Sequence, residues 1–408
     1  MRGDHGILAL PRTALVGAAG GLAPASGAAA VRRLVLTDFR GYGAARLQVT
    51  PAPVVLFGPN GAGKTNLLEA LSFLAPGRGL RRARLGEIDR RQRTPEGALG
   101  EPAGGAWAIH ASLEIQAGAI EIGTGREASE ASERRVLLID GETAKSQAAL
   151  ARHLGVVWLT PAMDRLFLEG GSARRRFLDR LVYGFDAEHA QRVSAYEQAM
   201  RERARLLRDG PMDASWLAAL EETMAATGIA IAAARHETVA QLDHASAEAI
   251  GAFPAARLAL RGEIEALLER LPALGAEDEM LARLKELRRQ DAKAGVTLLG
   301  PHRSDLVVRH AATLMPAAEG STGEQKALLI SIVLAHARLQ ATLKGRAPLL
   351  LLDEVAAHLD PARRGALFGE ILRLGAQAWL TGTDAALFEG LRGRAQFFSV
   401  ADAALAPA

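Results

Sequence analysis

The segment 58–65 has the residue types and spacing of a loop that binds phosphate. It reads Gly58-Pro59-Asn60-Gly61-Ala62-Gly63-Lys64-Thr65 and matches the pattern G-x-x-x-x-G-K-[ST] at every fixed position. In such a loop the glycines let backbone N–H groups turn inward around a polyphosphate, and the helix that follows points its positive end at it. We therefore expect Lys64 to reach the β- and γ-phosphates of ATP, and Thr65 to bind Mg²⁺.

The flanks of this segment favour a phosphate loop over the alternative, a Gly-rich turn without a ligand. The apolar run Val54–Phe57 predicts a strand before the loop, and the apolar-periodic run Leu67–Leu74 predicts a helix after it. Composition points the same way, because the chain has only six lysines and two asparagines, and Lys64 lies between both asparagines, Asn60 and Asn66. We assign Asn66 to the nucleotide site together with the loop residues.

Two carboxylates follow a second apolar run. Leu349–Leu352 predicts a buried strand, and Asp353 and Glu354 come directly after it. At the carboxyl edge of an open α/β sheet such groups face the ligand crevice. We expect Asp353 to join Thr65 in binding Mg²⁺, and Glu354 to orient or deprotonate the attacking water. An ordinary strand end is the alternative, and the phosphate loop makes it the weaker one.

A third motif, Ser321-Thr322-Gly323-Glu324-Gln325, opens the helix that precedes this strand. One interpretation is a capping box, in which Ser321 and Glu324 each satisfy an N–H group of the first turn. The other is a signature motif of the ATP-binding-cassette type, in which the helix start, the Ser321 hydroxyl and Gly323 face a γ-phosphate. The two are compatible. The order of phosphate loop, signature and acidic strand favours the second.

After the predicted strand Ala378–Leu380 comes Thr381-Gly382-Thr383. Many cassette ATPases carry a switch histidine at this place, and this chain has none there. A threonine would then have to sense the γ-phosphate, and we assign that role to Thr383.

Arginine clusters are candidates for DNA contacts. The first lies within 78–93 and includes Arg78, Arg81, Arg82 and Arg84, and the second includes Arg174 and Arg175. Each phosphate contact would steepen the salt dependence of DNA binding. A solvated surface is the alternative, because the net charge is only +3 and the chain favours arginine throughout.

The bulk composition sets limits on the class of protein. With 408 residues, 23% charged and 49% hydrophobic, the chain is typical of a globular protein of two or three domains. The absence of cysteine excludes disulfides and thiolate chemistry and is consistent with the cytoplasm. No uninterrupted apolar stretch of about 18 residues is present, so we expect no membrane span.

The composition and hydrophobic pattern of the chain change along its length. Residues 1–30 are rich in Ala and Gly, and we interpret them as a disordered leader or a start assigned too early, in preference to a secretory signal. We expect an α/β ATPase head whose first half is 31–170 and whose second half is 295–408, with a mostly helical lobe, 171–294, inserted between them. The other predicted strands are Val31–Phe39, Arg46–Val49, Trp107–Ile115, Ala119–Ile122, Arg134–Ile139, Val156–Leu159 and Asp305–Val308, and a long helix is predicted from Thr322 to about Leu343.

These motifs, in this order, resemble the RecF family of DNA replication and repair proteins, in the SMC-like branch of cassette ATPases. The resemblance spans Val31 to about Val400, and its departures are residues 1–30 and Ser304, where the family usually has Asp. The matching segments are Leu36–Arg40, Gly58–Thr65, Gly77–Gly79, Trp158–Pro161, Arg174–Asp179, Gly300–Arg303, Ser321–Gln325, Leu352–Glu354 and Thr381–Asp384.

The resemblance implies an ABC/SMC-type P-loop head with a helical second lobe. It also implies an ATP-dependent homodimer, in which Ser321 of one subunit completes the site at Lys64 of the other. Slow, DNA-stimulated ATP hydrolysis would follow, with binding to single-stranded, double-stranded and gapped DNA. The implied partners are RecR and RecO, which cooperate in loading RecA, and the implied roles include replication and SOS induction.

Other ATPases share the nucleotide motifs. An SMC or RecN-like protein would place long heptad arrays between Thr65 and Ser321, and a transporter ATPase would place its signature much nearer the phosphate loop. Neither pattern is present. A motor that moves along DNA remains the alternative to a clamp whose hydrolysis only resets binding, and we favour the clamp.

Overall fold

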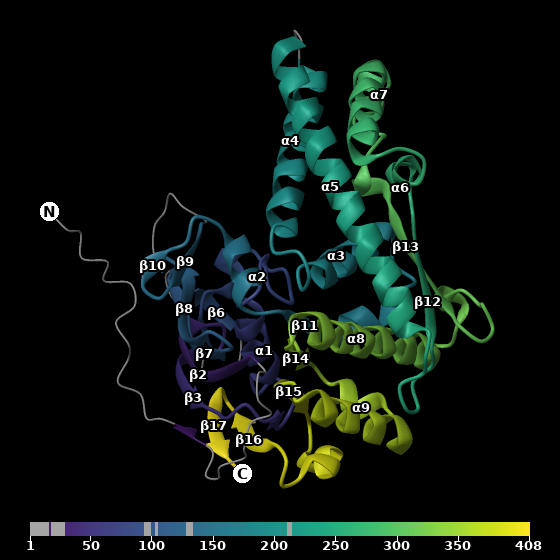
Figure 1. Cartoon of the computed structure of the whole chain (residues 1–408). Coiled ribbons are helices and arrows are strands. Elements are labelled where there is room, and N and C mark those ends of the chain that lie inside the picture. The colour runs from purple at the N-terminus through teal and green to yellow at the C-terminus, as the bar shows by residue number, and fades with distance from the viewer. Residues whose placement is uncertain (1–15, 18–28, 94–98, 103–104, 128–133, 210–213) are drawn as a thin grey trace, which may run out of the picture. The chain divides into compact units, whose positions relative to one another are not determined.

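The computed structural model describes residues 16–17, 29–93, 99–102, 105–127, 134–209 and 214–408 (Figure 1). Contacts divide the chain into two compact units. Unit 1 contains Met1–Pro161 and Gln340–Ala408, and unit 2 contains Ala162–Leu339.

A six-stranded sheet in unit 1 carries the phosphate loop. Its strand order is β11 (Val156–Leu159), β14 (Leu349–Leu352), β15 (Ala378–Gly382), β4 (Val54–Phe57), β16 (Gln396–Ala401) and β17 (Ala404–Pro407). All neighbours are parallel except β16 and β17. The strands β11, β14 and β15 are buried along their whole length, as expected for a parallel sheet covered on both faces. Because β4, β14 and β15 are parallel, their carboxyl ends meet at one edge of the sheet.

The second sheet of unit 1 is mainly antiparallel. Its order is β1 (Val16–Gly17), β3 (Tyr42–Gln48), β2 (Ala30–Phe39), β7 (Trp107–Ile115), β8 (Gly118–Arg126), β9 (Arg135–Ile139) and β10 (Glu142–Thr143). Apolar and polar residues alternate along β7, and every second side chain from Trp107 to Leu113 is buried. Trp107 packs against Phe39 and Phe73, with ring centroids 5.5 and 5.4 Å away. Unit 1 also contains a two-stranded sheet, β5 (Arg91–Arg93) with β6 (Leu99–Pro102).

The helices of unit 1 include α1 (Lys64–Ser72), α2 (Leu150–His153) and α9 (Pro361–Leu374). Helix α9 has favourable residues at its start, because Asp360 accepts a hydrogen bond from the Arg363 N–H and Pro361 occupies the first turn. Short 3₁₀ turns connect the other elements: η2 (Leu85–Ile88), η3 (Gln147–Ala149), η7 (Val355–His358) and η8 (Ala385–Leu391).

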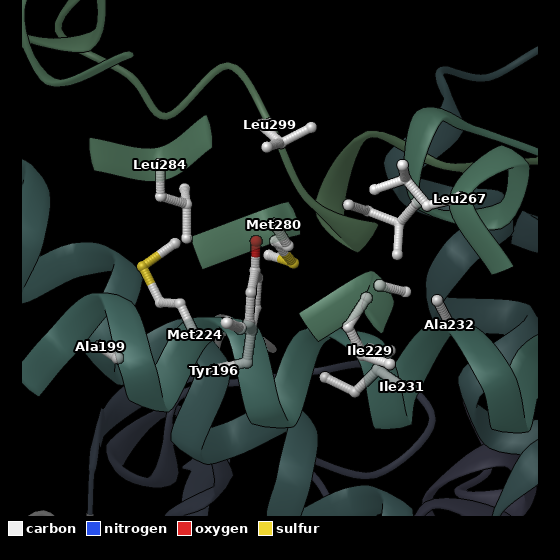
Figure 2. Packing of buried hydrophobic residues seen from close by; sticks show 13 residues of the cluster. Tyr196, Ala199, Met224, Ile229, Ile231, Ala232, Leu267, Met280, Leu284 and Leu299 are labelled. Carbon is white, nitrogen blue, oxygen red and sulfur yellow. The ribbon is translucent and has the colours of Figure 1, made fainter. Parts of the chain in front are cut away.

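Unit 2 is mostly helical. It contains η4 (Pro161–Arg165, from Ala162 on), α3 (Gly171–Val182), α4 (His189–Asp209), α5 (Ala214–Ser246), α6 (Glu263–Leu268), α7 (Ala273–Ala294), the 3₁₀ turns η5 (Pro301–Arg303) and η6 (Ala317–Glu319), and α8 (Thr322–Lys344) up to Leu339. Figure 2 shows its core, where Tyr196 of α4, Met224 and Ile229 of α5, and Met280 of α7 pack together. A Cβ at Gly228 would lie 2.9 Å from Met280 Cε. The absence of a side chain at residue 228 therefore allows Met280 of α7 to pack closely against α5.

Buried ion pairs also join the helices of unit 2. Arg203 is 0% exposed and donates to Glu221 at 3.0 Å and to Asp291 at 2.6 Å. Arg235 donates to both carboxylate oxygens of Asp179, at 2.7 and 2.9 Å. Buried charges require such partners, because an unpaired ion in the interior is very costly.

Within the predicted helical lobe, one strand was not predicted. The helical segment 171–294 contains β12 (Ala256–Arg261), which pairs antiparallel with β13 (Asp305–His310). Its residues alternate between buried and exposed, but six residues are a weak signal in an Ala/Leu/Arg-rich stretch, and the pairing partner lies far along the chain. The same pairing explains why unit 2 extends to Leu339, and not only to 294. Two hydrogen bonds also connect α8 to the rest of unit 2. One runs from Ser331 Oγ to Pro254 O, and the other joins His336 Nε2 and Leu181 O.

The prediction for residues 1–30 falls largely outside the described residues, which here are 16–17 and 29–30. Val16 and Gly17 pair in parallel with Leu47 and Gln48, and β2 already begins at Ala30. Val16, Gly17 and Ala30 therefore lie in strands, and the interpretation of residues 1–30 as a leader stays a prediction.

Two helices among the described residues are long and apolar enough to pass a test for membrane spans. They are α5 and α8, each with a mean hydropathy of 1.3 in its most apolar window. That window is 72% buried in α8 and 44% buried in α5, and α5 also carries the ion-paired Glu221 and Arg235. Core helices of folded proteins pass the same test, so length and composition do not overturn the expectation of no membrane span.

Candidate nucleotide-binding site

The phosphate loop connects β4 to α1, as its sequence predicts. Gly58 has φ 150° and Gly63 has φ 110°, both in the region that favours glycine. A Cβ at Gly58 would lie 2.1 Å from Val400 O, and a Cβ at Gly63 would lie 2.8 Å from the Tyr42 hydroxyl oxygen. These glycines are therefore needed both for backbone conformation and for close packing around the loop.

Lys64 is the first residue of α1 and is 4% exposed. Its Nζ donates to the carbonyl oxygens of Gly58, at 2.7 Å, and Pro59, at 2.8 Å. Burial lowers the pKa of Lys64, and the nearby carboxylates of Glu354 and Asp353 oppose this shift. The ammonium group thus lies over the loop, close to the acidic residues.

Asp353 is the point at which the two predicted motifs meet. Its Oδ1 accepts from the Thr65 hydroxyl at 3.0 Å and from the Thr381 hydroxyl at 2.8 Å. Asp353 is 5% exposed, and burial raises its pKa while the two hydroxyl hydrogen bonds oppose the shift. The sequence analysis assigned no role to Thr381; its only signal was its position directly after the predicted strand Ala378–Leu380.

The donor set fits Mg²⁺. This cation prefers oxygen ligands and is usually held by one or two protein groups together with phosphates and water. Thr65 and Asp353 supply a hydroxyl and a carboxylate side by side, and a cation would stabilise the charged form of the buried Asp353. Within the described residues no cluster of three or more His, Asp or Glu side chains offers a rival metal site.

Glu354 follows Asp353 with φ 53°, in the left-handed region. Its backbone N–H donates to the Thr381 hydroxyl at 2.8 Å. Thr383 lies just after β15 and is exposed. The structure therefore brings Lys64, Thr65, Asp353 and Glu354 together in unit 1, and it adds Thr381.

Ser321 and Gly323 belong to unit 2. The backbone N–H and the hydroxyl of Ser321 both donate to Glu324 Oε2, each at 2.8 Å, and the Glu324 N–H donates back to Ser321 Oγ at 3.3 Å. This is the predicted capping box. Ser321 and Gly323 are exposed at the start of α8, and no atom within 4 Å would contact a Cβ at Gly323. The capping interpretation is therefore correct, and it leaves the helix start accessible.

The candidate DNA-binding arginines differ in their surroundings. Arg81 donates to Asn66 Oδ1 at 2.8 Å and to the fully buried Glu69 at 3.0 Å, where it joins Arg40. It is thus attached to the phosphate-loop helix. Arg78, Arg82 and Arg84 are exposed.

The second cluster is engaged within unit 2. Arg174 forms two hydrogen bonds of 2.7 Å with Asp305, and Arg175 donates to Ser304 O at 2.6 Å. The Arg174 side chain is only 16% exposed. These contacts give both residues a structural role, and their assignment to DNA stays a prediction.

Comparisons with known proteins agree with this geometry. The family model for the RecF/RecN/SMC N terminal domain matches residues 30–391. The DNA replication and repair protein RecF of Rhizobium johnstonii is 52% identical over 372 residues, which are 91% of this chain and 96% of that protein. The protein of the same name from Mesorhizobium japonicum is 50% identical over 381 residues, or 92% and 97%.

Solved structures share the fold. A structure of the recombination mediator protein RecF with ATP covers 94% of this chain and 100% of its own, with a TM-score of 0.76 and 19% identity. The Smc head domain of Pyrococcus furiosus, bound to the C-terminal domain of ScpA, covers 93% and 96%, with a TM-score of 0.51 and 14% identity. At these identities the likeness concerns the fold.

Proposed function

Since this chain belongs to the RecF family of DNA replication and repair proteins, we propose that it is an ATP-gated clamp that closes on DNA as a dimer of two copies. The hydrogen bond between Thr65 and Asp353 carries the proposal, because it joins the phosphate loop and the acidic strand into one nucleotide site. ATP binding would close the clamp, and slow, DNA-stimulated hydrolysis to ADP and phosphate would reset it.

Each residue of the site has a distinct task. The loop 58–65, with Asn66 beside it, would hold the phosphates, and Lys64 would supply a compact positive charge to the β- and γ-phosphates. Thr65 and Asp353 would hold Mg²⁺, which when bound neutralises charge on the phosphates. Glu354 would orient the attacking water and accept its proton, because its carboxylate directly follows Asp353. Thr383 would sense the γ-phosphate.

The site is completed by a second copy of the chain. Ser321 and Gly323 are exposed at the start of the 23-residue helix α8. A helix start with accessible backbone and hydroxyl groups is suited to a phosphate carried by another molecule. We assign these residues to the γ-phosphate bound by the partner's phosphate loop, so that ATP holds two subunits together.

Membership of the family supports a proposal about the cellular setting. We propose that the clamp binds single-stranded, double-stranded and gapped DNA in the cytoplasm, and cooperates with RecR and RecO to load RecA. It would thereby support replication and SOS induction. A motor that translocates on DNA is the rival, and tight coupling of hydrolysis to movement along DNA would favour it.

Sedimentation with and without ATP, on gapped and blunt DNA, tests the clamp. Glu354→Gln should bind ATP, dimerise and stay closed, because it keeps a hydrogen-bonding side chain but removes the base. Ser321→Arg should bind ATP as a monomer, because a bulky cation occupies the docking position of the partner's γ-phosphate. If Ser321→Arg dimerises normally with ATP, the assignment of Ser321 to the partner's site is wrong.

Complementation separates the two halves of the site. A Lys64 variant mixed with a Ser321 variant still forms one intact composite site, from the loop of one subunit and the signature of the other. We expect partial recovery of ATPase activity on mixing. Heterodimers that form but stay inactive would show that a single site cannot fire alone.

A further inference from the structure

Thr381 lies at the centre of the acidic end of the sheet. It belongs to β15, the strand between β14, which leads to Asp353, and β4, which leads to the phosphate loop. In the register of the sheet Thr381 is opposite Leu56 of β4, and its neighbour Leu380 is opposite Leu352 of β14. The side chain is 1% exposed, so packing and hydrogen bonds determine its orientation.

The hydroxyl of Thr381 makes two hydrogen bonds with defined roles. The backbone N–H of Glu354 can only donate, so Thr381 Oγ1 accepts from it, at 2.8 Å. The single hydroxyl proton is then donated to Asp353 Oδ1, also at 2.8 Å. One side chain therefore bridges the two consecutive acidic residues, one through its carboxylate and the other through its backbone.

The bridge holds Glu354 in an unfavourable backbone conformation. At φ 53° Glu354 is in the left-handed region, which is unfavourable for a residue with a side chain because its Cβ comes too close to the following carbonyl oxygen. Such conformations persist where the surroundings over-determine them, and they cluster at active sites. Here the Thr381 hydroxyl satisfies the N–H of Glu354, which lies beyond the end of β14 and its strand pairing. The direction in which the Glu354 side chain leaves the backbone thus depends on this hydrogen bond.

We propose that Thr381 is a positioning residue for ATP hydrolysis, which sets the placement of the Glu354 carboxylate relative to Asp353. The inference rests on the proposed ATPase function and adds a residue to that same site. It separates Thr381 from Thr383, which lies two residues later, beyond the end of β15, and is exposed.

Isosteric substitution tests the proposal. Thr381→Val keeps the branched shape and removes the hydroxyl, and Thr381→Ser keeps the hydroxyl. Thr143→Val, at an exposed threonine of β10 in the same unit and outside the nucleotide site, is the control for losing a threonine hydroxyl. At saturating ATP, Thr381→Val should lower kcat by roughly 10- to 100-fold, the loss expected for hydrogen bonds to charged or catalytic groups. The ATP concentration for half-maximal rate should change less than about 3-fold, since the phosphate loop is intact. Thr381→Ser should retain most of the parental kcat.

A binding measurement gives a readout other than activity. In a titration of a fluorescent ADP analogue at increasing Mg²⁺, Thr381→Val should need several-fold more Mg²⁺ for half-maximal binding, because Asp353 has lost one of its two hydroxyl partners. If Thr381→Val unfolds, Thr381→Ser can be compared with Thr381→Ala. Both variants lack the branched methyl group, so they differ only in the hydroxyl.

The outcomes are distinct. If Thr381→Val has the parental kcat, or if Ser fails to rescue it, the positioning role is wrong while the ATPase assignment stands. If the parent itself does not bind and hydrolyse ATP, the proposed function fails and this inference fails with it. If Thr143→Val loses as much kcat as Thr381→Val, the bridge is not the cause.

Discussion

The hydroxyl of Thr65 donates to the carboxylate of Asp353 at 3.0 Å, although the two residues are 288 positions apart. One belongs to the helix that follows β4, and the other follows β14. The intervening strand, β15, pairs with both in parallel, so the carboxyl ends of all three strands lie together. The contact makes a phosphate-binding loop and a distant acidic pair parts of one nucleotide site.

Lys64→Arg should weaken nucleotide capture or its use. A guanidinium is a wide planar fork, whereas the ammonium of Lys64 is a point charge held within 2.8 Å of two loop carbonyls. We expect a loss of ATP affinity or kcat of at least about 10-fold, which corresponds to about 1.4 kcal/mol. Calorimetric titration and steady-state ATPase assays measure both quantities. Lys145→Arg, an exposed lysine of the same unit, is the control, and equal behaviour of the two variants would refute the loop assignment.

Replacing Arg82 and Arg84 by Ala, alone and together with Arg81→Ala, should flatten the salt dependence of duplex binding. The slope of log K against log salt should fall by roughly 0.9 for each phosphate contact that is lost. Arg81→Ala should also affect the nucleotide site, because Arg81 bonds to Asn66 and Glu69 of α1. Fluorescence anisotropy at several salt concentrations gives the slope. An unchanged slope would show that these arginines are solvated surface residues that do not contact DNA.

Arg174→Ala serves as a comparison for the variants of Arg81, Arg82 and Arg84. Since its guanidinium is bound to Asp305 by two hydrogen bonds of 2.7 Å, Arg174→Ala should lower the stability of unit 2, by roughly 1–3 kcal/mol. The salt slope of DNA binding should change little. A lower slope with unchanged stability would instead support a direct DNA contact.

Asp179→Asn should destabilise unit 2 strongly. Burial alone would raise the pKa of Asp179, but Arg235 and the hydrogen bonds from His189 and Arg235 lower it to about 2. The neutral side chain leaves Arg235 as an unpaired buried cation, with an expected cost of about 3–5 kcal/mol. Denaturant unfolding measures the loss, and the double variant Asp179→Asn/Arg235→Met should recover part of it. A loss below 1 kcal/mol would contradict this account.

His336 should make stability depend on pH. Burial lowers its pKa from 6.5 to about 4, and the hydrogen bond with Leu181 O only partly opposes this. Between pH 6.5 and 4 the unfolded chain binds a proton at this residue that the folded chain does not. The contribution of His336 to the free energy of unfolding is therefore complete above pH 6.5. It falls by up to about 3 kcal/mol as the pH drops to 4.

His336→Gln should remove this dependence, because an amide can still donate to Leu181 O but does not titrate. The measurement is urea unfolding at several pH values, with the partly exposed His310→Gln as control. The same pH slope in His336→Gln and the parent would show that His336 is not the titrating group.

Local patterns predicted much of the site. The strand Val54–Phe57 and the strand Leu349–Leu352 have the bounds that their apolar runs indicate. The helix predicted from the run Leu67–Leu74 is present and spans Lys64–Ser72. Such signals are short-range: an apolar run, a glycine spacing and a lysine that must reach a phosphate. The strand β12 was missed because its pairing with β13 depends on a segment more than forty residues later in the chain.

The choice between Thr381 and Thr383 shows what the sequence by itself determined and what it could not. Along a strand the two residues would face the same side, so alternation does not distinguish them. The structure ends β15 at Gly382, which leaves Thr381 buried in the sheet and Thr383 exposed. In the same way, a run of arginines does not reveal that Arg81 bonds to Glu69 or Arg174 to Asp305. Residue types and local spacing determined which chemistry the chain carries, and tertiary packing decided which side chains meet, because hydrogen bonds and ion pairs act over about 3 Å and depend on register between distant segments.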